Sequence, residues 1–218
     1  MAVHQTARFS VNPMRSHELA IMRIGRYLVQ HAERGMVYKV DRTKGLEVYA
    51  DADFAGAWSA ANASSADNVL SRTGFVICYA NCPIVWCSKL QTEISLSTAE
   101  AEYIALSHAL REAIPIQNLT KELNCVVPLN LLDTIFCLTV HKDNLSTIAM
   151  AESIKFTPRT KHIAIKYHHF RNRVRNSYNP KGDINIKYIN TKQQLADIMT
   201  KPVDEATFFT LRRLLCGW

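Results

Sequence analysis

The first forty residues show a helical pattern of apolar positions after an initial break. Asn12-Pro13 interrupts the chain. Four apolar residues then recur at near-helical spacing, namely Leu19, Ile21, Ile24 and Leu28. The pattern predicts a loop followed by a helix that ends near Gly35. Because one side of this helix is apolar, we expect it to pack on the remainder of the chain or on a partner.

From Leu46 onward the pattern changes to short apolar runs that are typical of strands. The predicted strands are 46–52, 73–79, 83–90, 135–140 and 183–189. The second and third form a predicted hairpin around Asn81-Cys82. The fourth is almost wholly apolar, as expected of a central strand that is covered on both faces.

The stretches between and after these strands predict helices. Ser97 and Glu100 form a capping box at the start of the first, in which Pro115 should introduce a kink or an end. The later predicted helices follow Asp143 to about Glu152, cover 160–177, open at a second capping box of Thr191 and Gln194, and cover 206–215. Strands that return after helices imply right-handed parallel crossovers, and the hairpin implies an antiparallel edge. The predicted fold class is α/β, a mixed five-stranded sheet with helices on both faces.

Composition adds a charge bias to this picture. The chain has 218 residues, 48% of them hydrophobic, and a net charge of +7. These values suit one folded domain with a short appendage, and the basic surplus favours a nucleic acid over a membrane as partner. The first ten residues lack the apolar core of a signal peptide, and no stretch approaches the roughly 20 apolar residues that span a bilayer. We therefore expect a soluble protein of the cytoplasm or nucleus with no membrane partner.

The six cysteines form no Cys-x-x-Cys pair. Cys78, Cys82 and Cys87 lie close together, but along a predicted hairpin and without the usual spacing of zinc ligands. We favour reduced, mostly buried thiols, with a zinc site as the alternative.

Four acidic residues lie at the ends of predicted elements: Asp51, Glu102, Asp143 and Asp197. If the first and fourth strands are parallel neighbours, Asp51 and Asp143 reach the same edge of the sheet. Converging carboxylates repel one another unless a cation lies between them, and Mg²⁺ prefers oxygen ligands. Two such ions about 3.5–4 Å apart can activate water and stabilise the leaving oxygen of a phosphodiester. The alternative is four unrelated surface acids.

The segment 155–187 is strongly basic, and Asp183 is its only acidic residue. Its basic residues are Lys155, Arg159, Lys161, Lys166, Arg171, Arg173, Arg175, Lys181 and Lys187. Such a surface can hold phosphates without reading sequence, and the alternative is a solvated helix face. Tyr167 and Phe170 are predicted core residues of this helix. Asn144 and 71–73 are candidates for contacts to 2′-hydroxyl groups.

Two tryptophans differ in their surroundings. Trp86 lies in an apolar strand and is predicted to be a core residue. Trp58 borders the stretch 57–71, which is rich in Ala, Ser and Asn and typical of an exposed loop. Trp58 is therefore either a core residue or a platform for stacking on a sugar or base.

Seven segments resemble, in order, the motifs of ribonuclease H domains from copia-type retrotransposon polyproteins. They are YADADFAG (49–56), SRTGF (71–75), PIVWCSK (83–89), LSTAEAEYIAL (96–106), DN (143–144), TKHI (160–163) and QLADIMTKP (194–202). The segment from Ala2 to about Tyr38 is similar to the end of the adjoining reverse transcriptase. The resemblance implies two parts: residues 1–44, the C-terminal remnant of the reverse transcriptase with its connection helix, and residues 45–218, a ribonuclease H-like domain.

The resemblance also implies an endonuclease that hydrolyses the RNA strand of RNA–DNA hybrids and leaves a 3′-hydroxyl and a 5′-phosphate. Its catalytic and metal-binding set falls on Asp51, Glu102, Asp143 and Asp197, with two Mg²⁺ ions that Mn²⁺ can replace. Asp53 is an alternative to Asp51, and Glu100 competes with Glu102 although the capping box already occupies it. The histidine that cellular ribonucleases H often carry before the last Asp is absent from 189–193.

The implied partners are an RNA–DNA hybrid and the reverse transcriptase part of the parent polyprotein. The predicted nucleic-acid-binding residues are Asn144, Arg159, Lys161, Lys166 and Arg171. The alternative function is a non-catalytic nucleic-acid-binding module or decayed fragment of a retroelement, because the polymerase metal motif and an integrase are absent from this chain.

Overall fold

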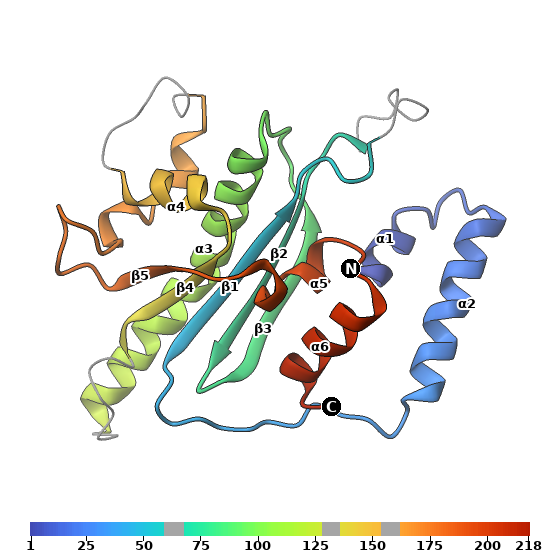
Figure 1. The fold of residues 1–218 in the computed structure, drawn as a ribbon, viewed down its shortest axis with the longest axis horizontal. Coiled ribbons are helices and arrows are strands. Elements are labelled where there is room, and N and C mark those ends of the chain that lie inside the picture. The colour runs from blue at the N-terminus through green and yellow to red at the C-terminus, as the bar shows by residue number, and fades with distance from the viewer. Residues whose placement is uncertain (59–67, 128–135, 154–161) are drawn as a thin grey trace.

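A five-stranded sheet forms the centre of the fold, with strand order β3-β2-β1-β4-β5 (Figure 1). The computed structural model describes residues 1–58, 68–127, 136–153 and 162–218. The strands are β1 (Leu46–Asp53), β2 (Arg72–Tyr79), β3 (Cys82–Leu90), β4 (Leu138–Lys142) and β5 (Ile184–Tyr188). The β1–β2 and β2–β3 pairs are antiparallel, and the β1–β4 and β4–β5 pairs are parallel. The predicted mixed sheet is confirmed.

Helices lie on both faces of this sheet, as predicted (Figure 1). The helices are α1 (Ala2–Ala7), α2 (Arg15–Gln30), α3 (Thr98–Val126), α4 (Leu145–Glu152), α5 (Asp197–Thr200) and α6 (Glu205–Cys216), with 3-10 turns η4 (Ile165–His168), η5 (Arg171–Arg173) and η6 (Thr191–Gln193). Val48 and Ala50 of β1 belong to the larger core beneath α3, whereas Tyr49 faces the other side with Leu211 of α6. This alternation along β1 follows from the period of two in a strand. No helix in the described ranges is long and apolar enough to span a membrane.

The hairpin between β2 and β3 turns at Ala80 and Asn81, whose φ angles are 49° and 67°. Two consecutive left-handed residues give the turn that matches the twist of a two-residue hairpin, and Asn tolerates that region better than most residues. The predicted hairpin is present, with its turn one residue earlier than expected. β4 is also displaced: it covers Leu138–Lys142 instead of 135–140, because pairing with β1 and β5 sets its ends.

The long helix α3 begins with only half of the predicted capping box. Ser97 accepts a hydrogen bond from the Glu100 backbone N–H at 3.2 Å, but Glu100 Oε2 accepts from the N–H of Leu96 instead of that of Ser97. The helix continues past Pro115 to Val126, so the first half does not end there.

The predicted helix over 160–177 is wrong. Residues 160 and 161 lie outside the described residues, and the following chain forms the 3-10 turns η4 and η5 before an isolated bridge between Val174 and Ile184. Tyr167, Phe170 and Val174 are buried, so the core prediction for the two aromatic residues is confirmed. A spacing of three to four residues between buried positions suits successive 3-10 turns as well as an α-helix, and here it misled the prediction.

The second predicted capping box is also wrong. Asn190, not Thr191, caps η6 by accepting from the N–H of Lys192, and α5 begins only at Asp197 without a side-chain cap. Gln194 is fully buried, and its amide donates to Ala50 O and His141 O, each at 3.4 Å. Its side chain therefore joins the segment before α5 to the β1–β4 pair and does not cap a helix.

α5 lies directly against β2 at Gly74. A Cβ at this position would lie 2.5 Å from Thr200 Cγ2 and 2.8 Å from Met199 Cβ. Gly74 pairs with Asp51 across β1 and β2. The missing side chain thus lets α5 approach the end of β1 that carries Asp51.

The N-terminal segment contains α1, where a loop was predicted, and the predicted helix, α2, which ends at Gln30 and not near Gly35. The segment contacts the end of the chain. The N–H of Val37 donates to Cys216 O at 2.9 Å, and the indole N–H of Trp218 donates to Gly35 O at 2.7 Å. Between them, Gly217 ends α6 in the left-handed conformation at φ 83°.

Candidate metal centre

The parallel pair β1–β4 brings two aspartates to one edge of the sheet. Tyr49 pairs with His141, so Asp51 and Asp143, each two residues further along, leave the sheet on the same face. The rings of Tyr49 and His141 lie on this face and stack with their centroids 4.5 Å apart. The carboxylates of Asp51 and Asp143 share the face because alternate residues of a strand point the same way. The predicted approach of the two strand ends is therefore found.

A third aspartate completes the group. Asp197, the first residue of α5, reaches the same edge from the late helix. Among the described residues, Asp51, Asp143 and Asp197 each offer a carboxylate oxygen, and these oxygens all lie within 4.8 Å of one another. We call these three residues the aspartate group. Asp51 is only 1% exposed, so the group lies at a sheltered rim.

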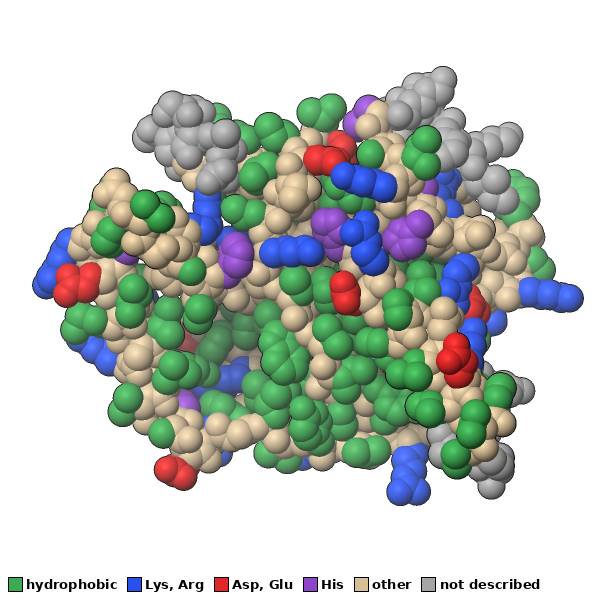
Figure 2. All heavy atoms as spheres, turned by 180° about the vertical axis from the view of Figure 1, so that it is seen from behind, with side chains coloured by type: hydrophobic (Ala, Val, Ile, Leu, Met, Phe, Trp, Pro, Cys, Tyr) green, Lys and Arg blue, Asp and Glu red, His purple; other side chains and the backbone are tan. Residues whose placement is uncertain are grey.

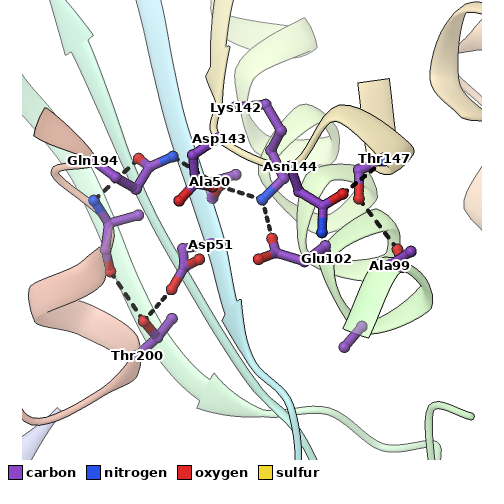
Figure 3. A network of polar contacts seen from close by, with 12 residues as sticks. Ala50, Asp51, Ala99, Glu102, Lys142, Asp143, Asn144, Thr147, Gln194 and Thr200 are labelled. Carbon is purple, nitrogen blue, oxygen red and sulfur yellow. Dashed lines mark hydrogen bonds and ion pairs between the residues drawn. The ribbon is translucent and has the colours of Figure 1, made fainter. Parts of the chain in front are cut away.

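Neighbouring side chains orient two of these carboxylates. Thr200 donates its hydroxyl to Asp51 Oδ2 (Figure 3). Thr191 donates its hydroxyl to Asp143 Oδ2 at 3.0 Å. Lys201 lies between two members, with its Nζ 3.6 Å from Asp51 Oδ2 and 3.1 Å from Asp197 Oδ1. Sequence reasoning missed Thr200 and Lys201, although both lie inside the QLADIMTKP segment.

The electrostatics of the group are those of carboxylates forced together. Burial opposes the ionisation of Asp51, yet Lys142, Lys201 and the Thr200 hydroxyl hold its pKa below the ordinary value. Burial and the charge of Asp51 raise the pKa of Asp197 to about 7, against the opposing effect of Lys201. One carboxylate of the group is thus kept ionised at the expense of another, as expected where like charges meet.

The donor set fits one divalent cation. Asp143 Oδ1 is buried and has no hydrogen-bond donor among the described residues. A buried carboxylate oxygen without a donor is costly unless a cation or water satisfies it. Three carboxylate oxygens at this separation are the hard ligands that Mg²⁺ prefers.

Glu102 differs from the aspartates in its partner. It lies on α3, is 5% exposed, and forms an ion pair with Lys142, the last residue of β4 (Figure 3). Lys142 is fully buried and also donates to Ala50 O at 2.7 Å. Burial raises the pKa of Glu102 to about 8, with Lys142 lowering it and Asp51 raising it further. Sequence reasoning missed Lys142, although its place in the alternation after Leu138 and Val140 marks it as inward-facing.

Known proteins match this chain over nearly its full length. The retrovirus-related Pol polyprotein from transposon RE1 of Arabidopsis thaliana is 32% identical over 207 residues, which are 95% of this chain and 13% of that protein. The corresponding polyprotein from transposon TNT 1-94 of Nicotiana tabacum is 32% identical over 218 residues, 98% of this chain and 14% of that protein. The chain belongs to the copia-type Pol polyprotein family. The predicted resemblance is confirmed.

This Pol homologue spans about one seventh of the length of the curated relatives it matches. No family model matches it. Among solved structures, the N-terminal RNase H domain of rv2228c from Mycobacterium tuberculosis, determined as a fusion with maltose binding protein, has a TM-score of 0.45 and 12% identity. That likeness covers 77% of this chain and 98% of the other.

The two alternative carboxylates of the Pol homologue lie outside the aspartate group. Asp53 lies two residues beyond Asp51, and burial and the charge of Asp51 raise its pKa. Glu100 accepts from the Leu96 N–H at 2.8 Å and pairs with His162 at 3.0 Å, so it holds the start of α3. Whether either replaces its neighbour in binding a cation stays a prediction.

The predicted nucleic-acid-binding residues have different surroundings. Asn144 caps α4 by accepting from the N–H of Thr147 at 3.0 Å. Lys166 is exposed and pairs with Glu93, and Arg171 lies half-buried in η5. Arg159 and Lys161 lie outside the described residues. The back of the molecule shows a band of Lys, Arg and His side chains above a more hydrophobic area (Figure 2).

Both tryptophans considered above are half-exposed at 53%. The prediction of a core position for Trp86 is wrong. Its strand, β3, is one of the two edge strands of the sheet. Trp86 pairs with Val76, whose face of the sheet is the one that α5 and α6 cover, and that cover does not bury this edge strand.

Proposed function

We propose that this Pol homologue is a metal-dependent ribonuclease H that hydrolyses the RNA strand of RNA–DNA hybrids. The observation that carries the proposal is the convergence of Asp51, Asp143 and Asp197 within 4.8 Å at the rim where two parallel strands end. Three distant segments of the chain supply these residues. A chance meeting of surface acids would not bury a carboxylate oxygen without a donor, as at Asp143.

The aspartate group would hold Mg²⁺ or Mn²⁺, and Thr200 and Thr191 would fix the orientation of Asp51 and Asp143. When bound, the cation supplies Lewis-acid stabilisation of the charge that develops on a phosphodiester during hydrolysis. Lys201 has a side chain that is 35% exposed, so it can turn away from the aspartates toward a phosphate at the same rim.

The substrate would lie across basic residues of the segment 155–187. Lys166 and Arg171, with Arg159 and Lys161, would contact phosphates, which position a duplex without reading its sequence. Asn144 follows Asp143 directly and would reach the RNA strand, where 2′-hydroxyl contacts distinguish RNA from DNA. The products would carry a 3′-hydroxyl and a 5′-phosphate.

Residues 1–44 would be the end of the preceding polymerase part of a polyprotein, which is the second proposed partner. The apolar side chains of α2 support this: Leu19, Leu28 and Val29 are 53%, 61% and 80% exposed. An amphipathic helix that leaves its apolar side chains in water is typical of an interface that lacks its other half.

The test is cleavage of a labelled RNA–DNA hybrid by the purified full chain with Mg²⁺, repeated with EDTA. Asp51→Asn should abolish cleavage, because it removes a charge from the aspartate group. Asp204→Asn is the matched control, since Asp204 is exposed, caps α6 through Thr207, and Asn caps helices equally well. Hybrid binding without cleavage by the wild-type protein would favour the non-catalytic module instead.

A further inference from the structure

The second cation that the resemblance implies would need Glu102 as a ligand, and in this structure Glu102 is paired with Lys142. Along β4, Leu138, Val140 and Lys142 point toward α3, whereas His141 and Asp143 point to the opposite face. Lys142, the last residue of β4, and Asp143, the residue after it, therefore point to different faces. Asp51 is in contact with both sites, because it belongs to the aspartate group and also hydrogen-bonds Glu102. Asp143 joins the aspartate group, and Lys142 reaches Glu102 (Figure 3).

The ammonium group of Lys142 is held there from two sides. It pairs with Glu102 Oε2 and donates to Ala50 O at 2.7 Å, and its side chain has no exposed surface. Lys201 is different, because its side chain is 35% exposed and can retreat into water when a cation arrives. Removing Lys142 from its place would leave a buried carbonyl and a buried carboxylate without their donor.

A divalent ion bound by Glu102 would have to lie in contact range of this fixed positive charge. Like charges in a buried setting repel strongly, and the ammonium already satisfies the carboxylate. We propose that this chain binds one divalent cation, on Asp51, Asp143 and Asp197, and that Lys142 permanently replaces the second. Glu102 then acts as the anchor of Lys142 and not as a metal ligand. This inference rests on the proposed function for the identity of the first site.

The test is the number of Mn²⁺ ions that the purified full chain binds, measured by isothermal titration calorimetry and by electron paramagnetic resonance of free Mn²⁺. The wild-type protein should bind one ion, and Asp143→Asn should lose it. Two ions per wild-type chain would overturn the inference and leave metal-dependent cleavage standing. No bound ion would overturn the metal centre itself and, with it, the proposed function.

Substitution separates the two lysines. Lys142→Met removes the fixed charge and frees Glu102, so binding should rise to two ions. Lys201→Met is the matched control and should still bind one. A single ion in Lys142→Met, with circular dichroism showing a native fold, would contradict the role given to Lys142.

If Lys142→Met does not fold, Glu102→Gln keeps the inference testable. Its affinity for Mn²⁺ should stay within about threefold of the wild-type value, because the side chain is not a ligand. A loss of more than about tenfold, the lower end of what even an outer-shell partner of a metal ligand costs, would overturn the inference. X-ray anomalous scattering from Mn²⁺ gives a second reading, with a peak among the aspartates and none beside Glu102.

Discussion

Asp183 and Asp197 are both sheltered aspartates of one small domain, and their surroundings change their acidity in opposite directions. Around Asp183, burial opposes ionisation, but Arg173 and Lys121 outweigh it and lower its pKa to about 2. Around Asp197, burial and the charge of Asp51 raise the pKa to about 7. Arg173 donates at 3.0 and 2.6 Å and Lys121 at 2.7 Å, so the carboxylate of Asp183 has its full set of partners.

The difference separates a carboxylate whose ion pairs stabilise the fold from one that, under the proposed function, would bind a cation. Asp183 precedes β5 and joins it to α3 through Lys121, so its ion pairs serve packing. Asp197 lies beside Asp51, and the partly exposed Lys201 is within ion-pair distance of both carboxylates. Strongly shifted acidity occurs in both settings, and only the identity of the neighbours tells which one is functional.

The largest expected effect is a difference in cleavage rate between variants of Asp197 and Asp183. Asp197→Asn should lower Mg²⁺-dependent cleavage by on the order of 1,000-fold, the scale of losing an essential catalytic group. Asp183→Asn should change the rate by less than about twofold, because that residue acts through stability alone. Single-turnover rates on a labelled hybrid at 25 °C measure both. Equal losses of cleavage rate in the two variants would contradict a catalytic role that belongs to Asp197 and not to Asp183.

Cation binding should separate the same two aspartates in stability. Mg²⁺ at about 100 times its dissociation constant should stabilise the wild-type protein by about 2.7 kcal/mol, because the ion binds the folded state. Asp183→Asn should keep this increment, since the aspartate group is intact. Asp197→Asn should lose most of it. Urea unfolding with and without Mg²⁺ gives the values, and an unchanged increment in Asp197→Asn would contradict its place as a ligand.

The pH dependence of stability tests the role of Asp183. The pKa of Asp183 is lowered in the folded state, so its contribution is present above the ordinary value of 3.8 and is lost as the pH falls through about 2. Asp183→Asn should cost about 1 kcal/mol at pH 6, a discounted figure because solvent reaches and screens the pair. The cost should shrink as the pH falls from 4 toward 2. A cost that is constant over that range would mean that the ion pairs are not its cause.

The smallest effect concerns the basic surface. Lys166→Ala should weaken hybrid binding by about two- to threefold and reduce the slope of log affinity against log salt by about 0.9, the value for one phosphate contact. Its pairing with Glu93 limits the gain from that contact. Arg15→Ala is a matched control, because Arg15 is an exposed cation paired with Glu18 on α2. A similar change in slope for Arg15→Ala would show a general charge effect.

The local pattern of apolar residues was enough to predict the features that depend on where strands end. The alternation along β1 and the apolar run before Asp143 predicted that Asp51 and Asp143 lie at one edge of the sheet, as the β1–β4 pair shows. The same alternation applied to Lys142 would have shown that a lysine enters the core. The buried position of Lys142 was overlooked because a lysine is rarely buried without a charged partner, and its partner, Glu102, lies 40 residues away in sequence.

The elements that were mispredicted depend on contacts between distant segments. Gln194 resembles a capping residue, but its amide is used by Ala50 and His141 across the sheet. Trp86 resembles a core residue in an apolar strand, but the strand lies at an edge of the sheet and the residue stays half-exposed. Spacing along a chain carries no information about which strands become edge strands.

The contact of Gly35 and Val37 with Trp218 and Cys216 has a practical consequence for dividing the chain. A cut at residue 44 would follow the predicted boundary, yet it would remove two hydrogen bonds from the C-terminal end of the chain, one at the last residue of α6 and one at Trp218. α6 supplies Leu211 to the core beside Tyr49, and only four residues separate α6 from α5. Loss of these contacts should therefore alter the position of Asp197 at the start of α5. A minimal active fragment should begin before Gly35.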